Sequence, residues 1–557
     1  MAKSKFSPVA TTLYFTKTCY LATKKWARAT MPGCPVKFLL NSFQGKSQKL
    51  LTKAQLKGQL PSLQDKDVQT MLSDLQGNIL CAHGRFHAAH VFLQFLPGKE
   101  KEARNWIAFF AEHAITSAQR QFQGNNAYRK LKFDDGTFAH IALSNSGYSY
   151  LQVPEDKKPT PANPQKRGKE VAYTNVFAQG AKARQDELLD PAVSAWESGF
   201  QSDIHALVIL GNDTKTQLEV SLQGLRNSVA SFATICTIEY GETVNGMFEK
   251  DGNRFSATVE HFGYRDGKSQ PLFFAEQLQQ EEKEGGTKRY NPQAALSLVL
   301  VKDHLGTTAL SFGSFLVYRK LEQNVKGFHA TRQGIAQDLG IDPALVGAFA
   351  VGRFEDGTPV VDHKEAIGNE VVTNDFNFDN DSSGLCCPFF SHIRKSNPRH
   401  ESVANKAGLD KTIEEERGHR IARRGIPYGG KLSDFSDLES LPESGVGLNF
   451  ICYQSDIHEQ FEFIQRRWLN NPRFLMPMKN SQTSYDVTGL DPLVGQKHPT
   501  APGAAKAPTH WPKAWGEELV KVEIEMSEFI TMKGGEYFFS PSISALKALA
   551  SLNNSGG

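Results

Sequence analysis

The order of apolar and polar residues repeats one layout in the two halves of the chain. In the first half, residues 90–96 read as a strand, and residues 100–120 follow with the spacing of a helix. In the second half, residues 313–320 are the strand-like run and residues 321–334 the helix-like stretch. This repetition predicts two α+β units, each an antiparallel sheet with helices on one face.

Shorter runs and polar stretches complete the expected organisation. Strand-like runs also occupy residues 206–210, 296–301 and 519–524, and residues 277–291, rich in Gln, Glu, Lys and Gly, are expected to form an exposed connection. The chain is therefore expected to comprise, in order, an N-terminal extension over 1–67, a first domain over 68–276, the connection over 277–291, a second domain over 292–545 and a tail over 546–557.

The first part of the chain is strongly basic. Residues 1–64 hold eleven Lys and Arg and no Asp or Glu, which leaves 52 basic against 60 acidic residues in the remainder. Such a composition favours a solvated, partly disordered extension. An organelle-import segment and an electrostatic anchor for an acidic partner are the alternatives. We expect no nucleic-acid partner.

The cysteines and the apolar runs bear on where the protein works. Seven cysteines, an odd number with Cys386 and Cys387 adjacent, favour a reducing compartment over a disulfide framework. No run of about 18 apolar residues occurs, so we expect no membrane span. Because no compact apolar region follows the start, secretion is the least supported location. A cytoplasmic location is expected, with organelle import through the basic extension as the alternative.

The most informative segment for chemistry surrounds one histidine. His392 is followed at +2, +3 and +7 by Arg394, Lys395 and Arg399. A haem needs an axial imidazole and counter-charges for two propionates, and this segment could supply both. No C-x-x-C-H sequence occurs, so covalent attachment of a c-type haem is not expected. Taken alone, the segment is a weak indication: any one of the chain's 16 histidines is more often a surface or core residue than a ligand, and the basic neighbours could form a solvated loop face.

Two further segments combine glycine or proline with charge. In residues 261–271, two glycines flank Asp266 closely, so the backbone can turn sharply and approach a flat ligand, or form an ordinary turn. In residues 419–429, Arg423 and Arg424 are adjacent between apolar residues. Such a pair suits either surface ion pairs or the buried cations of an anion pocket.

Taken together, the three segments resemble one family. Gly-x-x-Asp-Gly at 263–267, His-x-Arg-Lys-x-Asn-Pro-Arg at 392–399 and Arg-Arg-Gly-x-Pro-Tyr-Gly at 423–429 follow the order found in dye-decolorising (DyP-type) haem peroxidases. The resemblance spans about residues 70–545, and the stretch 460–465 is similar to the larger fungal and cyanobacterial members. Shorter matches lie at residues 74–80, 313–323, 351–359, 452–457 and 534–541.

The resemblance implies a fold and a cofactor. It implies two ferredoxin-like halves of the dimeric α+β barrel type, with one non-covalent haem b per chain held mainly by the second half. In this scheme His392 is the axial ligand of the iron, and Glu536 accepts a hydrogen bond from its far nitrogen. Arg399 lies at the propionates with help from Arg394, and Gly267 also belongs to the cofactor site.

The other side of the haem would carry the reaction with hydrogen peroxide. Asp266 matches the family's acid–base residue, which moves a proton between the two peroxide oxygens. Arg423 matches the arginine that stabilises developing negative charge, and Arg424 is the adjacent alternative. Leu448 and Phe450 match apolar residues that restrict access to small molecules.

The resemblance implies a peroxidase that oxidises dyes, phenolics and other organic reductants in one-electron steps. Because bulky dyes cannot reach the iron, Tyr428 and Trp468 are candidates for surface electron transfer, with plain packing as their alternative role. Two rival functions are a haem protein acting on porphyrin or iron, and a haem-storage protein without turnover. Assembly into a homo-oligomer is left open.

Overall fold

The computed structural model describes residues 60–131, 136–161, 175–250, 252–368, 370–404, 413–430, 435, 437–475, 487–497, 506–526 and 528–552. All of them belong to one compact unit, Lys46–Gly557. Most of the basic extension lies outside the described residues, and so does the end of the tail.

Four strands of the first half form an antiparallel sheet. Its order is β4-β1-β3-β2, with β1 (His87–Phe95), β2 (Phe138–Ser144), β3 (Ala206–Asn212) and β4 (Ala233–Glu242). Helices α4 (Glu100–His113) and α5 (Ala118–Leu131) connect β1 to β2, and α10 (Lys215–Val229) connects β3 to β4. This order and these crossovers define a ferredoxin-like unit.

The second half repeats the same order. Its sheet runs β14-β8-β11-β10, with β8 (Phe312–Gln323), β10 (Ile426–Tyr428), β11 (Gly447–Gln454) and β14 (Ile530–Ser540). Helix α12 (Val325–Leu339) follows β8, and the π-helical segments η6 (His458–Glu462) and η7 (Ile464–Leu469) follow β11. Two short strands, β7 (Val301–Lys302) and β9 (Ala422–Arg423), pair with β8 and β11.

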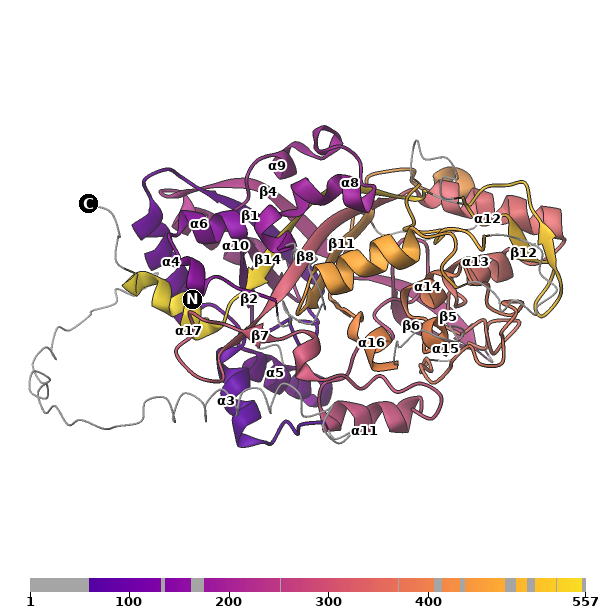
Figure 1. Cartoon of the computed structure of the whole chain (residues 1–557), viewed down its shortest axis with the longest axis horizontal. Coiled ribbons are helices and arrows are strands. Elements are labelled where there is room, and N and C mark those ends of the chain that lie inside the picture. Colours follow the sequence, from indigo (N-terminus) through magenta and orange to yellow (C-terminus); the bar gives the residue numbers. More distant parts are fainter. Residues whose placement is uncertain are drawn as a thin grey trace, which may run out of the picture. The chain divides into compact units, whose positions relative to one another are not determined.

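The two halves share one sheet. β14 pairs with β2 through Phe538 and Ser144, and through Phe539 and Leu143, so the strands of both halves form a single ten-stranded sheet. In Figure 1, β14 and β8 lie between the helices α4 and α10 of the first half and α12 to α14 of the second. The α+β fold with two ferredoxin-like halves is confirmed, but the expected pair of separate sheets is one continuous sheet.

The central strands read as unbroken apolar runs because both of their faces are covered. On β1, Val91 and Leu93 point into a core with helix α4, whereas Phe92 points to the opposite face. There Phe92 packs with Phe538 of β14 and with α3 (Lys66–Asp74). A strand buried on both sides gains nothing from alternation, so its sequence is apolar throughout.

Several predicted elements differ from those observed. Residues 296–301 give a single helical turn, Leu296–Leu298, and only the end of the run reaches β7. The run at 519–524 becomes β13 (Leu519–Lys521), which pairs with β12 (His510–Pro512) in a two-stranded sheet separate from the main one. The last strand of the main sheet is β14, which the pattern misses because Gly534 and Gly535 interrupt it. A side chain at Gly534 would collide with the ring of Phe200.

The expected domain boundaries also cross packed structure. Ser62 Oγ donates to Glu276 Oε1 at 2.5 Å, and the Ala275 amide donates to the Pro61 carbonyl at 3.1 Å. The described end of the extension is therefore tied to α11 (Ala275–Glu284), which itself begins the expected connection. At the other end, Leu546 of α17 (Ile543–Ala548) is fully buried, so the tail starts later than expected.

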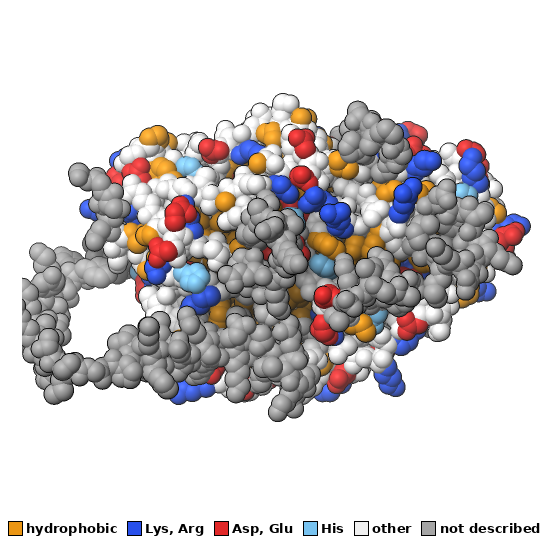
Figure 2. Space-filling view, viewed as in Figure 1, with side chains coloured by type: hydrophobic (Ala, Val, Ile, Leu, Met, Phe, Trp, Pro, Cys, Tyr) orange, Lys and Arg blue, Asp and Glu red, His pale blue; other side chains and the backbone are white. Residues whose placement is uncertain are grey.

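The remaining features of the fold concern membrane spans, surface charge and the cysteines. Among the described residues, no single helix is long and apolar enough to cross a membrane; α12 and α13 (Pro343–Val351) pass only as a pair bent by 115°. Figure 2 shows acidic and basic side chains interspersed over one face. The described cysteines are free thiols, including the adjacent Cys386 and Cys387.

Candidate active site

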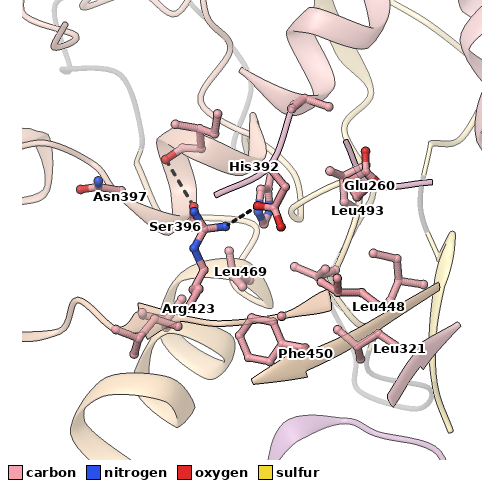
Figure 3. A pocket seen from close by; sticks show the side chains of 18 of the residues that line it. Glu260, Leu321, His392, Ser396, Asn397, Arg423, Leu448, Phe450, Leu469 and Leu493 are labelled. Atoms are coloured by element: carbon pink, nitrogen blue, oxygen red, sulfur yellow. Dashed lines mark hydrogen bonds and ion pairs between the residues drawn. The ribbon is translucent and has the colours of Figure 1, made fainter. Parts of the chain in front are cut away.

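One cavity collects most of the candidate residues. Its volume is about 270 Å³, and it is lined by the turn that precedes residue 271, by α14 (His392–Ser396), by β11 and by η7. The turn belongs to the range assigned to the first half, and the rest of the lining belongs to the second. The walls are largely apolar, and Figure 3 shows several of these side chains around Arg423 and His392. The apolar lining includes Leu321, Val351, Ile393, Leu448, Phe450, Phe461, Ile464, Leu469, Leu493 and Met532.

A carboxylate and two glycines shape the turn that carries Asp266. Glu260 accepts the Phe262 amide at 2.8 Å and the Tyr264 amide at 3.0 Å. Gly263 has a φ of 96° and Gly267 a φ of 78°, values that side-chain-bearing residues rarely adopt. Gly267 does not line the cavity, and an added Cβ would meet nothing within 4 Å. Its contribution is therefore to the backbone turn rather than to contact with a cofactor.

Asp266 faces Arg423 in the cavity. Arg423 Nη1 lies 3.4 Å from Asp266 Oδ1, and Nη2 donates to the Lys268 carbonyl at 2.7 Å. Figure 3 marks contacts of the Arg423 guanidinium with dashed lines. The two side chains keep 35% and 31% of their surface exposed, so both remain available to a small ligand. Strand β9 places Arg423 here through its pairing with β11.

The neighbouring arginine has a different environment. Arg424 donates from Nε to the Asn78 carbonyl at 2.9 Å and from Nη2 to the Ile79 carbonyl at 3.1 Å. It is buried and does not line the cavity. Of the two adjacent arginines that the sequence leaves open, the structure therefore brings Arg423 to Asp266.

His392 lies in the same cavity, backed by a buried carboxylate. Its Nδ1 lies 2.8 Å from Oδ2 of Asp491, which is fully buried. Asp491 Oδ1 accepts the amides of Leu493 and Val494, both at 2.9 Å. With Nδ1 held as the donor, Nε2 of His392 has no hydrogen-bond partner in the described part of the chain and is left to bind a ligand.

The expectation that Glu536 orients His392 is wrong. Glu536 is buried, accepts the Ala181 amide at 2.9 Å and lies 3.8 Å from Lys182 Nζ. It does not line the cavity. The sequence misses Asp491 because 99 residues separate it from His392, and an Asp before a proline in a loop carries no local sign of this contact.

The two arginines expected at the propionates are occupied elsewhere. Arg394 is fully buried, lies 2.9 Å from Asp381 and 2.5 Å from Glu401, and does not line the cavity, so its expected supporting role is wrong. Arg399 donates to the Asn374 carbonyl at 2.7 Å and is also outside the lining. Its Nε is buried without a partner among the described residues.

An arginine without an assigned role lines the cavity instead. Arg353 is 3% exposed, and its Nη1 donates to the carbonyls of Gly357 at 2.7 Å and Thr373 at 3.0 Å. Its Nη2 has no partner among the described residues, and no described carboxylate forms a salt bridge with it. Burial, together with the like charges of Arg399 and Arg265, lowers the pKa of Arg353 to about 9. Lys268 also lines the cavity, and burial lowers its pKa.

These features fit a haem. The cavity has apolar walls for the ring and an imidazole with a ligand-free nitrogen for the iron. For the propionates it offers Lys268 and the buried Arg353, which forms no salt bridge with a described carboxylate and has one unpaired donor. An uncompensated buried cation is costly unless an anion joins it. The unpaired Nη2 of Arg353 therefore points to an anionic ligand.

The two candidate aromatic residues are not on the surface. Tyr428 is 9% exposed and Trp468 4%. Trp468 stacks on Phe474 with ring centres 5.2 Å apart and meets His419 edge-on at 5.5 Å. The expectation of a surface location is wrong for both residues. Aromatic rings pack around Trp468, and Lys320 Nζ lies 5.0 Å from the centre of the Tyr428 ring.

One cavity therefore combines a histidine backed by a buried carboxylate, a carboxylate–guanidinium pair and a buried arginine with an unpaired donor. This combination is that of a haem peroxidase. Comparison with known proteins agrees. Residues 355–474 match the family model described as "Dyp-type peroxidase, C-terminal". The chain belongs to the DyP-type peroxidase family, as its motifs predict.

Relatives match along most of their length. The chain is 37% identical to the multifunctional dye peroxidase DyP2 of Amycolatopsis sp., covering 87% of this chain and 97% of that protein. It is 28% identical to the dye-decolorizing peroxidase msp1 of Mycetinis scorodonius, over 75% of this chain and 77% of that one. The crystal structure of a DyP-type peroxidase from Anabaena sp. superposes with a TM-score of 0.75 at 38% identity, covering 89% of this chain and 98% of that one.

Proposed function

We propose that this chain is a haem-dependent peroxidase that reduces hydrogen peroxide and oxidises dyes, phenolics and other organic reductants in one-electron steps. The observation that carries the proposal is that one cavity holds both His392 with its Asp491 partner and the Asp266–Arg423 pair. Relatives named as dye peroxidases support the substrate class.

The cofactor proposed is haem b, bound without a covalent link, one per chain. His392 Nε2 would ligate the iron, and Arg353 and Lys268 would face the propionates, with Arg399 behind them. When bound, the haem would supply an iron at which peroxide is reduced, and it would store the two oxidising equivalents that peroxide brings until reductants remove them.

Asp491 sets the character of the proximal imidazole. Its carboxylate accepts a hydrogen bond from Nδ1–H of His392, which fixes the tautomer and makes the imidazole a stronger electron donor. The two backbone amides on Oδ1 hold this carboxylate in place. Full burial strengthens the interaction, because solvent does not screen it.

Asp266 and Arg423 divide the work on peroxide. The Asp266 carboxylate takes a proton from one peroxide oxygen and returns it to the other, which becomes the leaving water. Arg423 stabilises the negative charge that develops when the proton is removed. Its contact with the Lys268 carbonyl holds the guanidinium beside the carboxylate before peroxide arrives.

Large reductants would deliver electrons without entering the cavity. Leu448 and Phe450 line it from β11 and narrow the space for anything larger than peroxide. Leu469, next to Trp468 in the chain, also lines the cavity. Trp468 therefore suits a buried electron relay better than a surface port, and Tyr428 stays a candidate of the same kind.

The proposal is tested on the purified full chain titrated with haem. We expect a Soret band at one equivalent of haem, a change of that band with one equivalent of peroxide, and its return when a phenol or a bulky dye is added. A Soret band that peroxide leaves unchanged would indicate a haem-storage protein. Release of iron from the porphyrin would indicate a haem protein that acts on porphyrin or iron. The cytoplasmic location and any homo-oligomer stay predictions.

A further inference from the structure

One buried lysine near His392 has no role in the scheme above. Lys395 lies three residues after His392 on α14, so the two side chains share one face of the helix. Lys395 is 0% exposed. Its Nζ donates to the Asn471 carbonyl at 2.8 Å and lies 3.4 Å from the carbonyl oxygens of Trp468 and Phe474.

These contacts suit the charged form of the amine. The Trp468 carbonyl lies in the last turn of η7, where helix carbonyls lack partners within the helix and favour a cation. The Asn471 and Phe474 carbonyls come from the loop that follows η7 and place two more oxygens around the amine. The Phe474 ring lies 5.7 Å from Nζ as a fourth favourable neighbour. A neutral amine has only two N–H groups and would turn its lone pair towards one of the carbonyls, whereas the ammonium has a proton for each.

The end of η7 that Lys395 contacts also holds the carboxylate residue that supports His392, because the Asp491 amide donates to the Leu469 carbonyl at 3.1 Å. No described carboxylate lies within salt-bridge distance of Lys395 Nζ. Burial lowers the pKa of Lys395 to about 7, and Asp491 is the charged group that acts in the opposite direction. Asp491 therefore interacts with the His392 Nδ1 proton at 2.8 Å and, at longer range, with a buried cation. A nearby cation weakens the pull of a carboxylate on a proton.

We propose that Lys395 is a positioning residue of the proximal wall. It fixes the end of η7 beside α14, and through Asp491 it limits the negative charge that His392 acquires. The consequence is a higher reduction potential of the bound cofactor than a histidine–aspartate pair alone would give. This inference rests on the proposed haem peroxidase function.

The test replaces Lys395 by methionine, which keeps the length of the side chain and removes its charge. The one-electron reduction potential of the haem-loaded protein is measured at about pH 5.5, where the amine of the wild type is protonated. We expect K395M to lower the potential by at least the equivalent of a ten-fold change in the ratio of reduced to oxidised protein, about 59 mV. In the D491N background, K395M should change the potential much less, because the carboxylate through which Lys395 acts on His392 is then absent.

Two controls separate this effect from a general loss of buried charge or of folding. Lys320 is also buried (8% exposed), but its charge is balanced by Glu197 and Glu239, both at 2.7 Å, so K320M should leave the potential unchanged. K395Q keeps N–H donors for the carbonyls but has no charge, and it should lower the potential as K395M does. If K395M does not fold, K395Q provides the measurement in its place.

An unchanged potential in K395M or K395Q would overturn the inference, and so would an equal shift in the D491N background or in K320M. Wild-type protein without a Soret band would instead overturn the proposed function itself. The two failures are therefore distinguishable.

Discussion

Replacing Asp491 by asparagine tests the proximal side of the site most directly. The carboxylate receives three donors, His392 Nδ1 on one oxygen and the amides of Leu493 and Val494 on the other. An asparagine offers one acceptor oxygen and one NH₂ group. D491N must therefore either turn its NH₂ group towards the imidazole or turn it towards two buried amides.

The expected magnitude follows from this mismatch. A hydrogen bond to a charged group contributes about 1.5–3 kcal/mol, and a buried donor left unpaired costs about 1–3 kcal/mol. Partners behind a metal ligand typically change metal affinity by about 10–100-fold, which is the same range of free energy. D491N should therefore bind haem about 10–100-fold more weakly than the wild type, and its reduction potential should rise because the imidazole donates less charge.

The assay is a Soret titration of the apoprotein with haem, followed by a potential measurement at saturation. E536Q is the matched control, because Glu536 is also a buried carboxylate of the second half but bonds the Ala181 amide instead of the histidine. E536Q should keep the affinity and the potential of the wild type. Wild-type affinity and potential in D491N would refute the reasoning, as would an E536Q variant that reproduces the D491N phenotype.

Four further predictions concern other parts of the site. H392A should purify with little haem and show no peroxidase activity, measured by the Soret band and by dye bleaching; normal haem content would contradict the axial assignment. D266N should slow the stopped-flow reaction with peroxide by about 10²–10⁴-fold, and R423L by about 10²–10³-fold, whereas rates within a factor of two of the wild type would exclude either role. Burial raises the pKa of Glu260 from 4.5 to about 7, so between these values the folded chain holds a proton that the unfolded chain has lost, and stability falls as the pH rises through this window. Because E260Q cannot titrate at this position, its melting temperature minus that of the wild type should increase between about pH 5 and pH 8. A difference that does not change with pH would contradict the raised pKa of Glu260. W468F should slow the oxidation of bulky dyes but not the reaction with peroxide, and equal dye rates would leave packing as its role.

The sequence predicts those features whose chemistry is local. The Gly-x-x-Asp-Gly turn brings Asp266 to the cavity because two backbone angles and one capping carboxylate decide its shape within a few residues. The repeated strand–helix layout predicts both ferredoxin-like halves because apolar periodicity is also local. The strand β14, by contrast, lacks that periodicity: its glycines make room for Phe200, a contact that only the tertiary structure reveals.

Partnerships between distant residues could not be predicted. The motif places Arg394, Lys395 and Arg399 within seven residues after His392, and from the sequence alone all three are cations near a haem. The structure gives them different partners: two carboxylates for Arg394, three carbonyls for Lys395, and carbonyls with aromatic rings for Arg399. Each partner comes from a segment whose position depends on the whole fold.

The contrast between Arg394 and Arg353 shows how the cation arrangement itself indicates the ligand. Where this protein buries a permanent structural cation, as at Arg394, it supplies Asp381 and Glu401 at salt-bridge distance. At Arg353, the described residues supply two carbonyl oxygens and the face of the Phe376 ring but no carboxylate at salt-bridge distance, and one donor stays unpaired, although this site is also buried. A cation left uncompensated destabilises the empty site, and an anion that binds there recovers this free energy as affinity and as stability of the folded state. The cavity is therefore built for a ligand that brings negative charge with it, as the propionates of a haem do.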